Sequence, residues 1–211
     1  AAAEQAMAEC QAEQLPVKFV EFNAKEYDSY EKMIKTIIKN EYKFDILVNN
    51  FGIGSPGKDL DLIQGDPQTF FDILHVNIAS VYLTCRYAIP FMIEHGGGSI
   101  VNIASIGGVQ PDISRLGYTT SKAAIIYMTK NIAVQYARDG IRCNVVAPGM
   151  IGTNAVKAHM SQEFQTAFLR HVPLNRMGEP DDIANAVIFL ASDASSYITG
   201  SLQEVAGGYG V

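Results

Sequence analysis

The chain has 211 residues, of which 48% are hydrophobic and 18% are charged, and its formal net charge is -6. A chain of this length and composition buries one sizeable core, so we expect a single domain over residues 1–211. The acidic balance and the scattered basic residues argue against a nucleic-acid partner and against binding to an anionic membrane surface. No uninterrupted apolar run reaches the ~18–20 residues that span a bilayer.

Cysteine and histidine usage narrows the class of protein further. Cys10, Cys85 and Cys143 lie far apart and are odd in number, which fits neither a disulfide framework nor a zinc site. The four histidines show no metal-ligand spacing, so we expect no metal. These features, with the charged N-terminal residues, favour a reducing compartment, and we expect a cytoplasmic protein.

Strands and helices alternate along the chain. We predict strands at 17–22, 44–48, 100–104, 141–147 and 201–205, and helices at 2–14, 28–40, 67–94, 118–138, 154–172 and 180–191. Short apolar strands that alternate with helices of 10–20 residues predict an α/β fold, with a doubly wound, Rossmann-like parallel sheet covered on both faces.

Polar side chains gather where the predicted strands end. Asn23, the pair Asn49 and Asn50 with Gly52, Ser105, and the pair Pro148–Gly149 each follow an apolar strand. Because ligands of open parallel sheets bind outside the carboxyl ends of the strands, this coincidence predicts a ligand site at that edge.

Tyr118 and Lys122 are four residues apart at the start of a long apolar helix, so they share one face of it. A lysine charge within ~4–6 Å of a tyrosine favours the phenolate form. Ser105, at the end of the preceding strand, can hydrogen-bond the same substrate oxygen, and the three groups suit proton transfer at a carbonyl or alcohol oxygen. The spacing alone also occurs by chance on many helices.

Together these motifs resemble the short-chain dehydrogenase/reductase family over nearly the whole chain. The resemblance implies a catalytic tetrad of Asn77, Ser105, Tyr118 and Lys122 and a nicotinamide cofactor, NAD or NADP. In the same resemblance, residues at the strand ends contact the cofactor, together with Tyr118 and Lys122. They are Asn23, Asn49, Asn50, Gly52, Pro148, Gly149, Ile151 and Thr153.

A narrower resemblance concerns the substrate. Residues 96–103, 111–115, 171–176 and 204–208 are similar to bacterial 7α-hydroxysteroid dehydrogenases, which implies oxidation at the 7α-hydroxyl of a bile acid. We expect residues 150–175, with Met150, Met160, Phe164, Phe168 and Leu169, to form a lid over this apolar substrate; ordinary helix packing is the alternative. A 3-oxoacyl or sugar substrate, or a non-catalytic relative of the family, also remains open.

The chain departs from the family in one respect. The family's opening Thr-Gly-x-x-x-Gly-x-Gly turn has no counterpart before Asn49. We therefore expect the sheet order 3-2-1-4-5-6 with 17–22 as the third strand, 44–48 as the fourth, and the first βαβ portion missing from residues 1–211. The position that selects between NAD and NADP is absent with it.

The helix at 118–137 is apolar on more than one face. A helix of this kind needs a partner beyond its own sheet. With the helix at 67–94 as co-participant, we expect a symmetric homotetramer.

Overall fold

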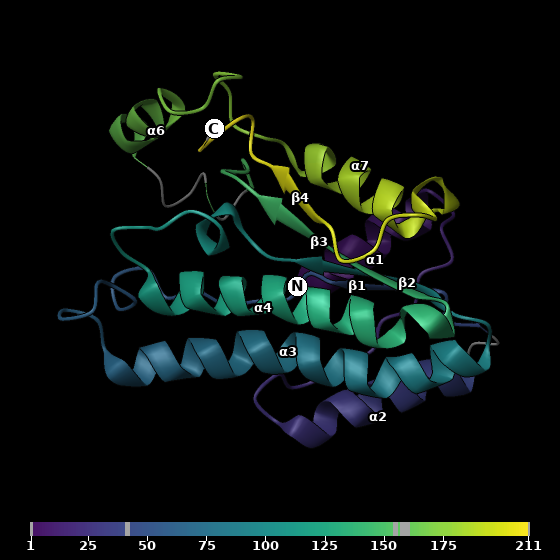
Figure 1. The fold of residues 1–211 in the computed structure, drawn as a ribbon. Helices are drawn as coiled ribbons and strands as arrows, with labels where there is room; N and C mark the ends of the chain where they lie inside the picture. The colour runs from purple at the N-terminus through teal and green to yellow at the C-terminus, as the bar shows by residue number, and fades with distance from the viewer. Residues whose placement is uncertain (1, 41–42, 154–155, 157–160, 211) are drawn as a thin grey trace.

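The computed structural model describes residues 2–40, 43–153, 156 and 161–210. In these residues, four parallel strands form a sheet in the order β1-β2-β3-β4 (Figure 1). The strands are β1 (Ile46–Asn49), β2 (Gly98–Ile103), β3 (Ile141–Pro148) and β4 (Leu202–Val205). The predicted α/β fold with a parallel sheet is confirmed.

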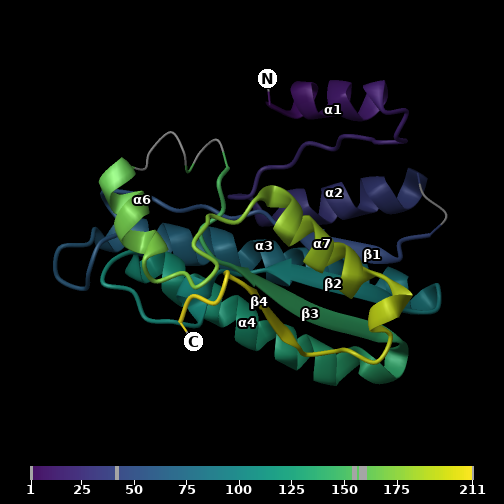
Figure 2. The same ribbon diagram turned by 90° about the horizontal axis from the view of Figure 1, so that it is seen from above.

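Helices cover both faces of the sheet. On one face lie α2 (Tyr27–Asn40), α3 (Pro67–Glu94) and α4 (Leu116–Tyr136), and on the other lies α7 (Pro180–Ala191) (Figures 1 and 2). The larger core packs α3 and α4 against the sheet, and a smaller one joins Val101, Ile103 and Val146 to Leu190 of α7. Short 3₁₀ turns at Ile106–Gly108, Ala137–Asp139 and Asp193–Ser195 link these elements.

Two further helices lie outside these layers. Helix α1 (Ala2–Ala12) lies on the β1 side of the molecule (Figure 2). Helix α6 (Gln162–Leu169) lies beyond the carboxyl ends of the strands and represents the predicted helical region 154–172; residues 154–155 and 157–160 of that region are outside the described residues.

Helix α3 begins as the sequence predicts. The Asp66 carboxylate accepts from Thr69 N, which caps the helix, and Pro67 occupies the first turn, where its missing N–H costs nothing. By length and composition α3 resembles a membrane span, but 61% of its most apolar window is buried within the protein. It is therefore a core helix.

The predicted strand at 17–22 is wrong. This segment is extended but pairs with no strand in the described part of the chain, and Val17 and Phe19 are 45% and 59% exposed. Apolar alternation cannot make a strand without a ladder partner for its N–H and C=O groups. The end of the segment is held instead by Phe22, whose ring lies 5.1 Å from that of Tyr30 and 5.9 Å from that of Phe51. The expected order with 17–22 in the sheet is not seen, and β1 is an edge strand.

Candidate active site

Helix α4 carries both Tyr118 and Lys122 on the face that meets the sheet. The Lys122 Nζ lies 5.6 Å from the centre of the Tyr118 ring, which confirms that the four-residue spacing puts them together. Lys122 is 3% exposed, and its Nζ donates to Ile103 O, at the end of β2, over 3.0 Å. Burial lowers the Lys122 pKa to about 8, because desolvation penalises the charged form.

Ser105 lies two residues after the end of β2 and caps the short turn Ile106–Gly108. Its Oγ accepts from Gly107 N over 3.2 Å, so the hydroxyl proton stays available for a substrate oxygen. This turn packs tightly on α4: a Cβ on Gly108 would lie 2.7 Å from the carbonyl carbon of Lys122. The absence of a side chain at Gly108 thus lets the strand end and the helix approach each other.

Asn77 lies in the middle of α3 and is fully buried. Its Oδ1 accepts from Ile53 N over 2.7 Å, and its Nδ2 donates to Ile53 O over 3.0 Å and to Ser121 Oγ over 2.9 Å. Asn77 therefore braces the segment after β1 against α3 and α4. At Gly52, a Cβ would lie 3.2 Å from Lys122 Nζ, so the glycine keeps the space beside the ammonium open.

Asn49 is part of a buried chain of hydrogen bonds rather than an open ligand contact. Thr84 Oγ1 donates to Asn49 Oδ1 over 2.7 Å, and Asn49 Nδ2 donates to Asn102 Oδ1 over 2.8 Å. Asn102 Nδ2 then donates to Thr129 Oγ1 over 2.9 Å, so the chain links α3, β1, β2 and α4. Asn50, the next residue, is exposed at the strand end.

No sequence motif marks Asn102, Thr84 or Thr129 as members of this chain of hydrogen bonds. The available signal was Asn102 itself, an amide inside the apolar run Ile100–Ile103, since a buried polar group requires partners.

The segment after β3 is shaped by tight backbone contacts. A Cβ on Gly149 would lie 2.8 Å from Ala206 Cα, so glycine permits the two strand ends to meet. Ile151 forms an isolated parallel bridge with Gly178, made by the Met150 carbonyl and the Gly152 amide. The Ile151 N–H takes no part in that bridge. Thr153 Oγ1 accepts from Val156 N over 3.3 Å.

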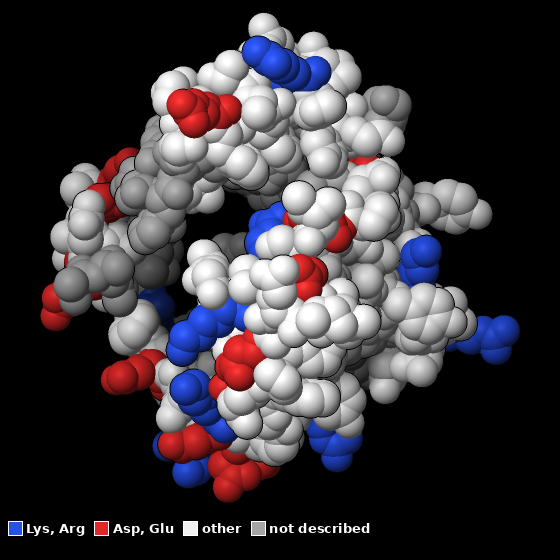
Figure 3. Space-filling model, turned by 90° about the vertical axis from the view of Figure 1, so that its left-hand side faces the viewer, with Lys and Arg blue, Asp and Glu red and all other residues white. Residues whose placement is uncertain are grey.

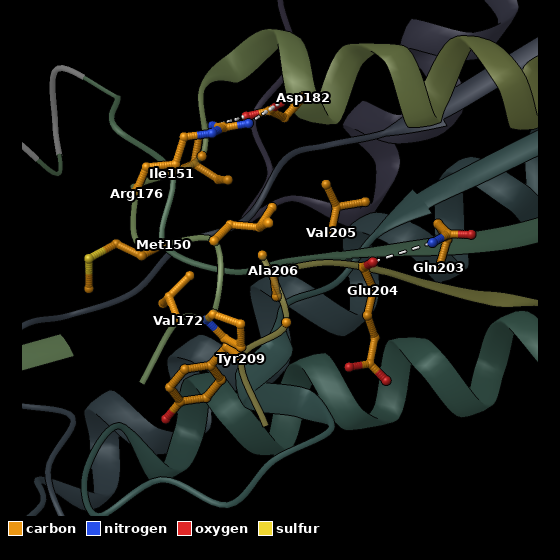
Figure 4. A pocket seen from close by; sticks show the side chains of 15 residues that line it. Met150, Ile151, Val172, Arg176, Asp182, Gln203, Glu204, Val205, Ala206 and Tyr209 are labelled. Carbon is orange, nitrogen blue, oxygen red and sulfur yellow. Dashed lines mark hydrogen bonds and ion pairs between the residues drawn. The ribbon is translucent and has the colours of Figure 1, made fainter. Parts of the chain in front are cut away.

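Beside this segment lies an open cavity of about 680 Å³. The Arg176–Asp182 ion pair lies at one end of it and Val172 with Tyr209 at the other (Figure 4). The Tyr209 ring stacks on Phe168 of α6, with centroids 4.9 Å apart and planes at 7°. None of the four tetrad residues lines the cavity, so the cavity does not enclose the tetrad.

Among the predicted lid residues, Phe164 is 57% exposed and Phe168 contacts Tyr209, whereas Met160 lies outside the described residues. Asn23 is exposed and belongs to the turn before α2, where its Oδ1 accepts from Lys25 N and its Nδ2 donates to Glu26. Figure 3 looks onto the face at the carboxyl ends of the strands, which is deeply hollowed, with Lys and Arg side chains beside the hollow.

The described residues fit a nicotinamide nucleoside. Of the three hydrogens on Lys122 Nζ, the bond to Ile103 uses one, and the two others suit a ribose diol in the space that Gly52 leaves open. The Ile151 N–H and the Thr153 hydroxyl, near the end of β3, suit a carboxamide.

Comparisons with known proteins agree with this geometry. A family model described as "Enoyl-(Acyl carrier protein) reductase" matches residues 1–210. The chain is 55% identical over 192 residues to a 7alpha-hydroxysteroid dehydrogenase from Clostridium sardiniense, which covers 91% of this chain and 73% of that protein. It is 34% identical to a 3-oxoacyl-[acyl-carrier-protein] reductase from Thermotoga maritima, over 94% of this chain and 80% of that one.

A solved structure shows the same fold. The crystal structure of a putative short-chain dehydrogenase/reductase from Burkholderia xenovorans matches with a TM-score of 0.89 and 32% identity, over 98% of this chain and 79% of that one. The chain therefore belongs to the short-chain dehydrogenase/reductase family and is an oxidoreductase that uses a nicotinamide cofactor.

Proposed function

We propose that this protein oxidises the 7α-hydroxyl group of a bile acid to the 7-oxo group, with NAD or NADP as the cofactor. The observation that supports the reaction class is the Lys122 ammonium beside the Tyr118 ring at the end of β2, the strand that Ser105 follows two residues later. The substrate class rests on the 55% identity to the 7alpha-hydroxysteroid dehydrogenase of Clostridium sardiniense.

Each residue of the tetrad has a distinct task in this proposal. Tyr118 takes the proton from the substrate hydroxyl as the general base, with the Lys122 ammonium beside its ring. Ser105 donates to the substrate oxygen and holds it in place. Asn77 keeps the segment 50–53 against α3 and α4, as its three hydrogen bonds support. The bound nicotinamide supplies the hydride acceptor.

The cofactor contacts follow from the same placement. With the cofactor bound, Lys122 and the space at Gly52 would hold the ribose, and the Ile151 N–H and the Thr153 hydroxyl would hold the carboxamide, with Pro148 and Gly149 shaping the same strand end. Asn49 would act indirectly by fixing the end of β1, and Asn50 and Asn23, both exposed, would contact the adenine end of the cofactor.

An apolar substrate suits the other side of the site. Phe168 and Tyr209 present stacked rings, and Val172 is 6% exposed beside them. The adjoining cavity, at about 680 Å³, lies within the ~300–1,000 Å³ typical of small-molecule sites. We propose that residues 150–175 cover the steroid from this side.

We also propose that the protein assembles as a homotetramer in the cytoplasm. Two separate apolar surfaces support the assembly: Tyr127 and Val134 of α4 are 69% and 82% exposed, and Ile188 of α7 is 64% exposed. Two independent self-complementary surfaces generate a tetramer with dihedral symmetry. The free thiols of Cys10, Cys85 and Cys143 fit a reducing compartment.

A substrate panel tests the proposed function. Bile acids with a hydroxyl at 3α, 7α, 7β or 12α, together with a sugar alcohol and a 3-hydroxyacyl thioester, are each incubated with NAD and with NADP, and cofactor reduction is followed by absorbance. We expect the highest kcat/KM with 7α-hydroxy bile acids. A preference for another steroid position or for the thioester contradicts the proposal, and no reduction with any alcohol indicates a non-catalytic relative.

A further inference from the structure

The helix that carries Tyr118 begins without a cap of its own. Arg115 occupies the N-cap position of α4 in a left-handed conformation, with φ of 58°, and makes no side-chain capping hydrogen bond. The first N–H groups of any α-helix have no partner inside the helix. At α4 these include the amides of Leu116, Gly117 and Tyr118 itself, so their partners must come from elsewhere in the chain.

Asp59, in the loop between β1 and α3, provides these partners. Its Oδ1 accepts from Gly117 N over 2.8 Å and its Oδ2 accepts from Tyr118 N over 2.9 Å. Its backbone carbonyl accepts from Arg115 N over 3.1 Å, and the next carbonyl, of Leu60, accepts from Leu116 N over 3.2 Å. Four consecutive amides at the start of α4 are thus held by two consecutive residues of one loop.

The Asp59 carboxylate is buried against the Gly117 and Tyr118 amides. Asp59 is 3% exposed, and none of the ion pairs in the described part of the chain includes it. The positive end of α4 therefore provides its electrostatic partner. Gly117 permits the approach, because a Cβ there would lie 3.1 Å from Asp59 Oδ1 and 3.3 Å from Phe70 Cα.

The loop itself is closed and firmly placed. Asp59 N donates to Ser55 O over 2.9 Å, and Asp66 N, at the cap of α3, donates to Lys58 O over 3.1 Å. The loop also borders the Tyr118 ring, since a Cβ on Gly54 would lie 3.7 Å from Tyr118 Cδ2. In Figure 1 the loop lies beside the first turn of α4, at the carboxyl ends of the strands.

From these contacts we infer that Asp59 is a positioning residue: its carboxylate fixes the start of α4 and thereby sets where Tyr118 stands relative to Ser105 and the substrate oxygen. This inference rests on the proposed role of Tyr118 in proton transfer. We call the two hydrogen bonds from the Gly117 and Tyr118 amides to the Asp59 carboxylate the clamp. Loss of the clamp shifts Tyr118, and misplacement of a reacting group by about 1 Å costs up to ~100-fold in rate.

Steady-state kinetics of Asp59→Asn and Asp59→Ala, with the cofactor and the best alcohol of the panel, tests the inference. Asp59→Asn keeps one acceptor oxygen, so we expect its kcat to fall about 10-fold. Asp59→Ala keeps none, so we expect its kcat to fall about 100-fold. The KM for the cofactor should stay within about two-fold of the original value in both variants. Asp61→Asn is the matched control: Asp61 is an exposed residue of the same loop that accepts from Ile63 N and Gln64 N, and its change should leave kcat within about two-fold.

A double-mutant cycle separates positioning from a general loss of structure. If Asp59 acts through Tyr118, Asp59→Asn lowers kcat in the original protein but not the residual kcat of Tyr118→Phe. An equal loss in both backgrounds, or an unchanged kcat in the single variant, overturns the inference.

Amide hydrogen exchange tests, without any substrate, whether the Asp59 carboxylate holds the Gly117 and Tyr118 amides. We expect exchange at Gly117 and Tyr118 to accelerate about 10-fold or more in Asp59→Asn and to stay unchanged in Asp61→Asn. Unchanged exchange in Asp59→Asn overturns the clamp even if the protein oxidises bile acids. Accelerated exchange in a protein that oxidises no alcohol contradicts the proposed function and leaves the clamp itself established.

Discussion

Lys122 lies one turn after Tyr118 on the same helix, with its ammonium 5.6 Å from the centre of the Tyr118 ring and hydrogen-bonded to Ile103 O at the end of β2. This arrangement keeps a lysine almost wholly buried, and burial lowers its pKa from 10.5 to about 8. The lysine to which we assign a role in the reaction is thus held in an environment that penalises its charged form, so its substitution should change both stability and activity.

The first prediction concerns stability and pH. Because the Lys122 pKa is lower in the folded protein, the folded state binds fewer protons between pH 8 and 10.5, and stability rises with pH across that window. Below about pH 8 the full penalty, at most about 3 kcal/mol, opposes folding. Lys122→Met removes the charge but also its bond to Ile103 O, so we expect the free energy of unfolding to rise by about 1–2 kcal/mol at pH 7.

Urea denaturation of both proteins at pH 7 and pH 10 measures this difference. The advantage of Lys122→Met should disappear at pH 10, where the folded lysine is neutral, while activity stays at least ~100-fold reduced at both pH values. Lys130→Met, at an exposed position of the same helix, should show neither change. A less stable Lys122→Met protein at pH 7 would contradict the pKa argument.

The second prediction concerns the phenol. Tyr118→Phe removes the hydroxyl that we propose exchanges the proton and leaves the ring contacts in place, so we expect kcat to fall by ~10²–10⁴ with little change in thermal stability. Tyr197→Phe serves as the control, because Tyr197 is fully exposed on another element. Comparable kcat values for Tyr118→Phe and the original protein would remove Tyr118 from the mechanism.

The third prediction concerns the buried chain of hydrogen bonds through Asn49 and Asn102. Asn49→Ala leaves the buried Asn102 Oδ1 without its donor, whereas Thr84 Oγ1 keeps Ser80 O as an acceptor, so we expect a loss of about 1–3 kcal/mol in the free energy of unfolding. Asn131→Ala, at an exposed position of α4, should change it by less than about 0.5 kcal/mol. Equal stability of the two variants in urea would show that the chain is not a structural brace.

The fourth prediction concerns assembly. Val134→Glu should disrupt one proposed interface and Ile188→Glu the other, because each places a charge on an exposed apolar surface. Sedimentation at micromolar concentration should show a tetramer for the original protein, dimers for each single variant and monomers for the double variant. A monomeric original protein would refute the tetramer.

Much of the fold was predictable because apolar periodicity and turn residues agree with it. The Asp66–Pro67 start of α3 and the Gly140 turn before β3 appear where the sequence places them. The segment 17–22 was mispredicted since its alternation carries no information about a neighbour, and a strand depends on its ladder partner.

In the candidate site, too, contacts between residues close in sequence were predictable and contacts between distant residues were not. The Tyr118–Lys122 pair is local in sequence, so helical geometry predicts it. Asp59 joins α4 across nearly sixty residues and is one acidic residue among several in a polar loop, so no local pattern distinguishes it. Likewise Asn102 and Thr129 meet only when β2 and α4 pack together.

The most direct test of the account follows the hydrogen that leaves C7. A 7α-hydroxy bile acid carrying deuterium at the 7β position is oxidised by the protein with NAD and, separately, with NADP, and both products are analysed by mass spectrometry and NMR. The account predicts a 7-oxo bile acid without the label, one deuterium in each reduced nicotinamide, and loss of both products in Tyr118→Phe. Retention of deuterium at C7 with cofactor reduction, or transfer that persists at full rate in Tyr118→Phe, would contradict it.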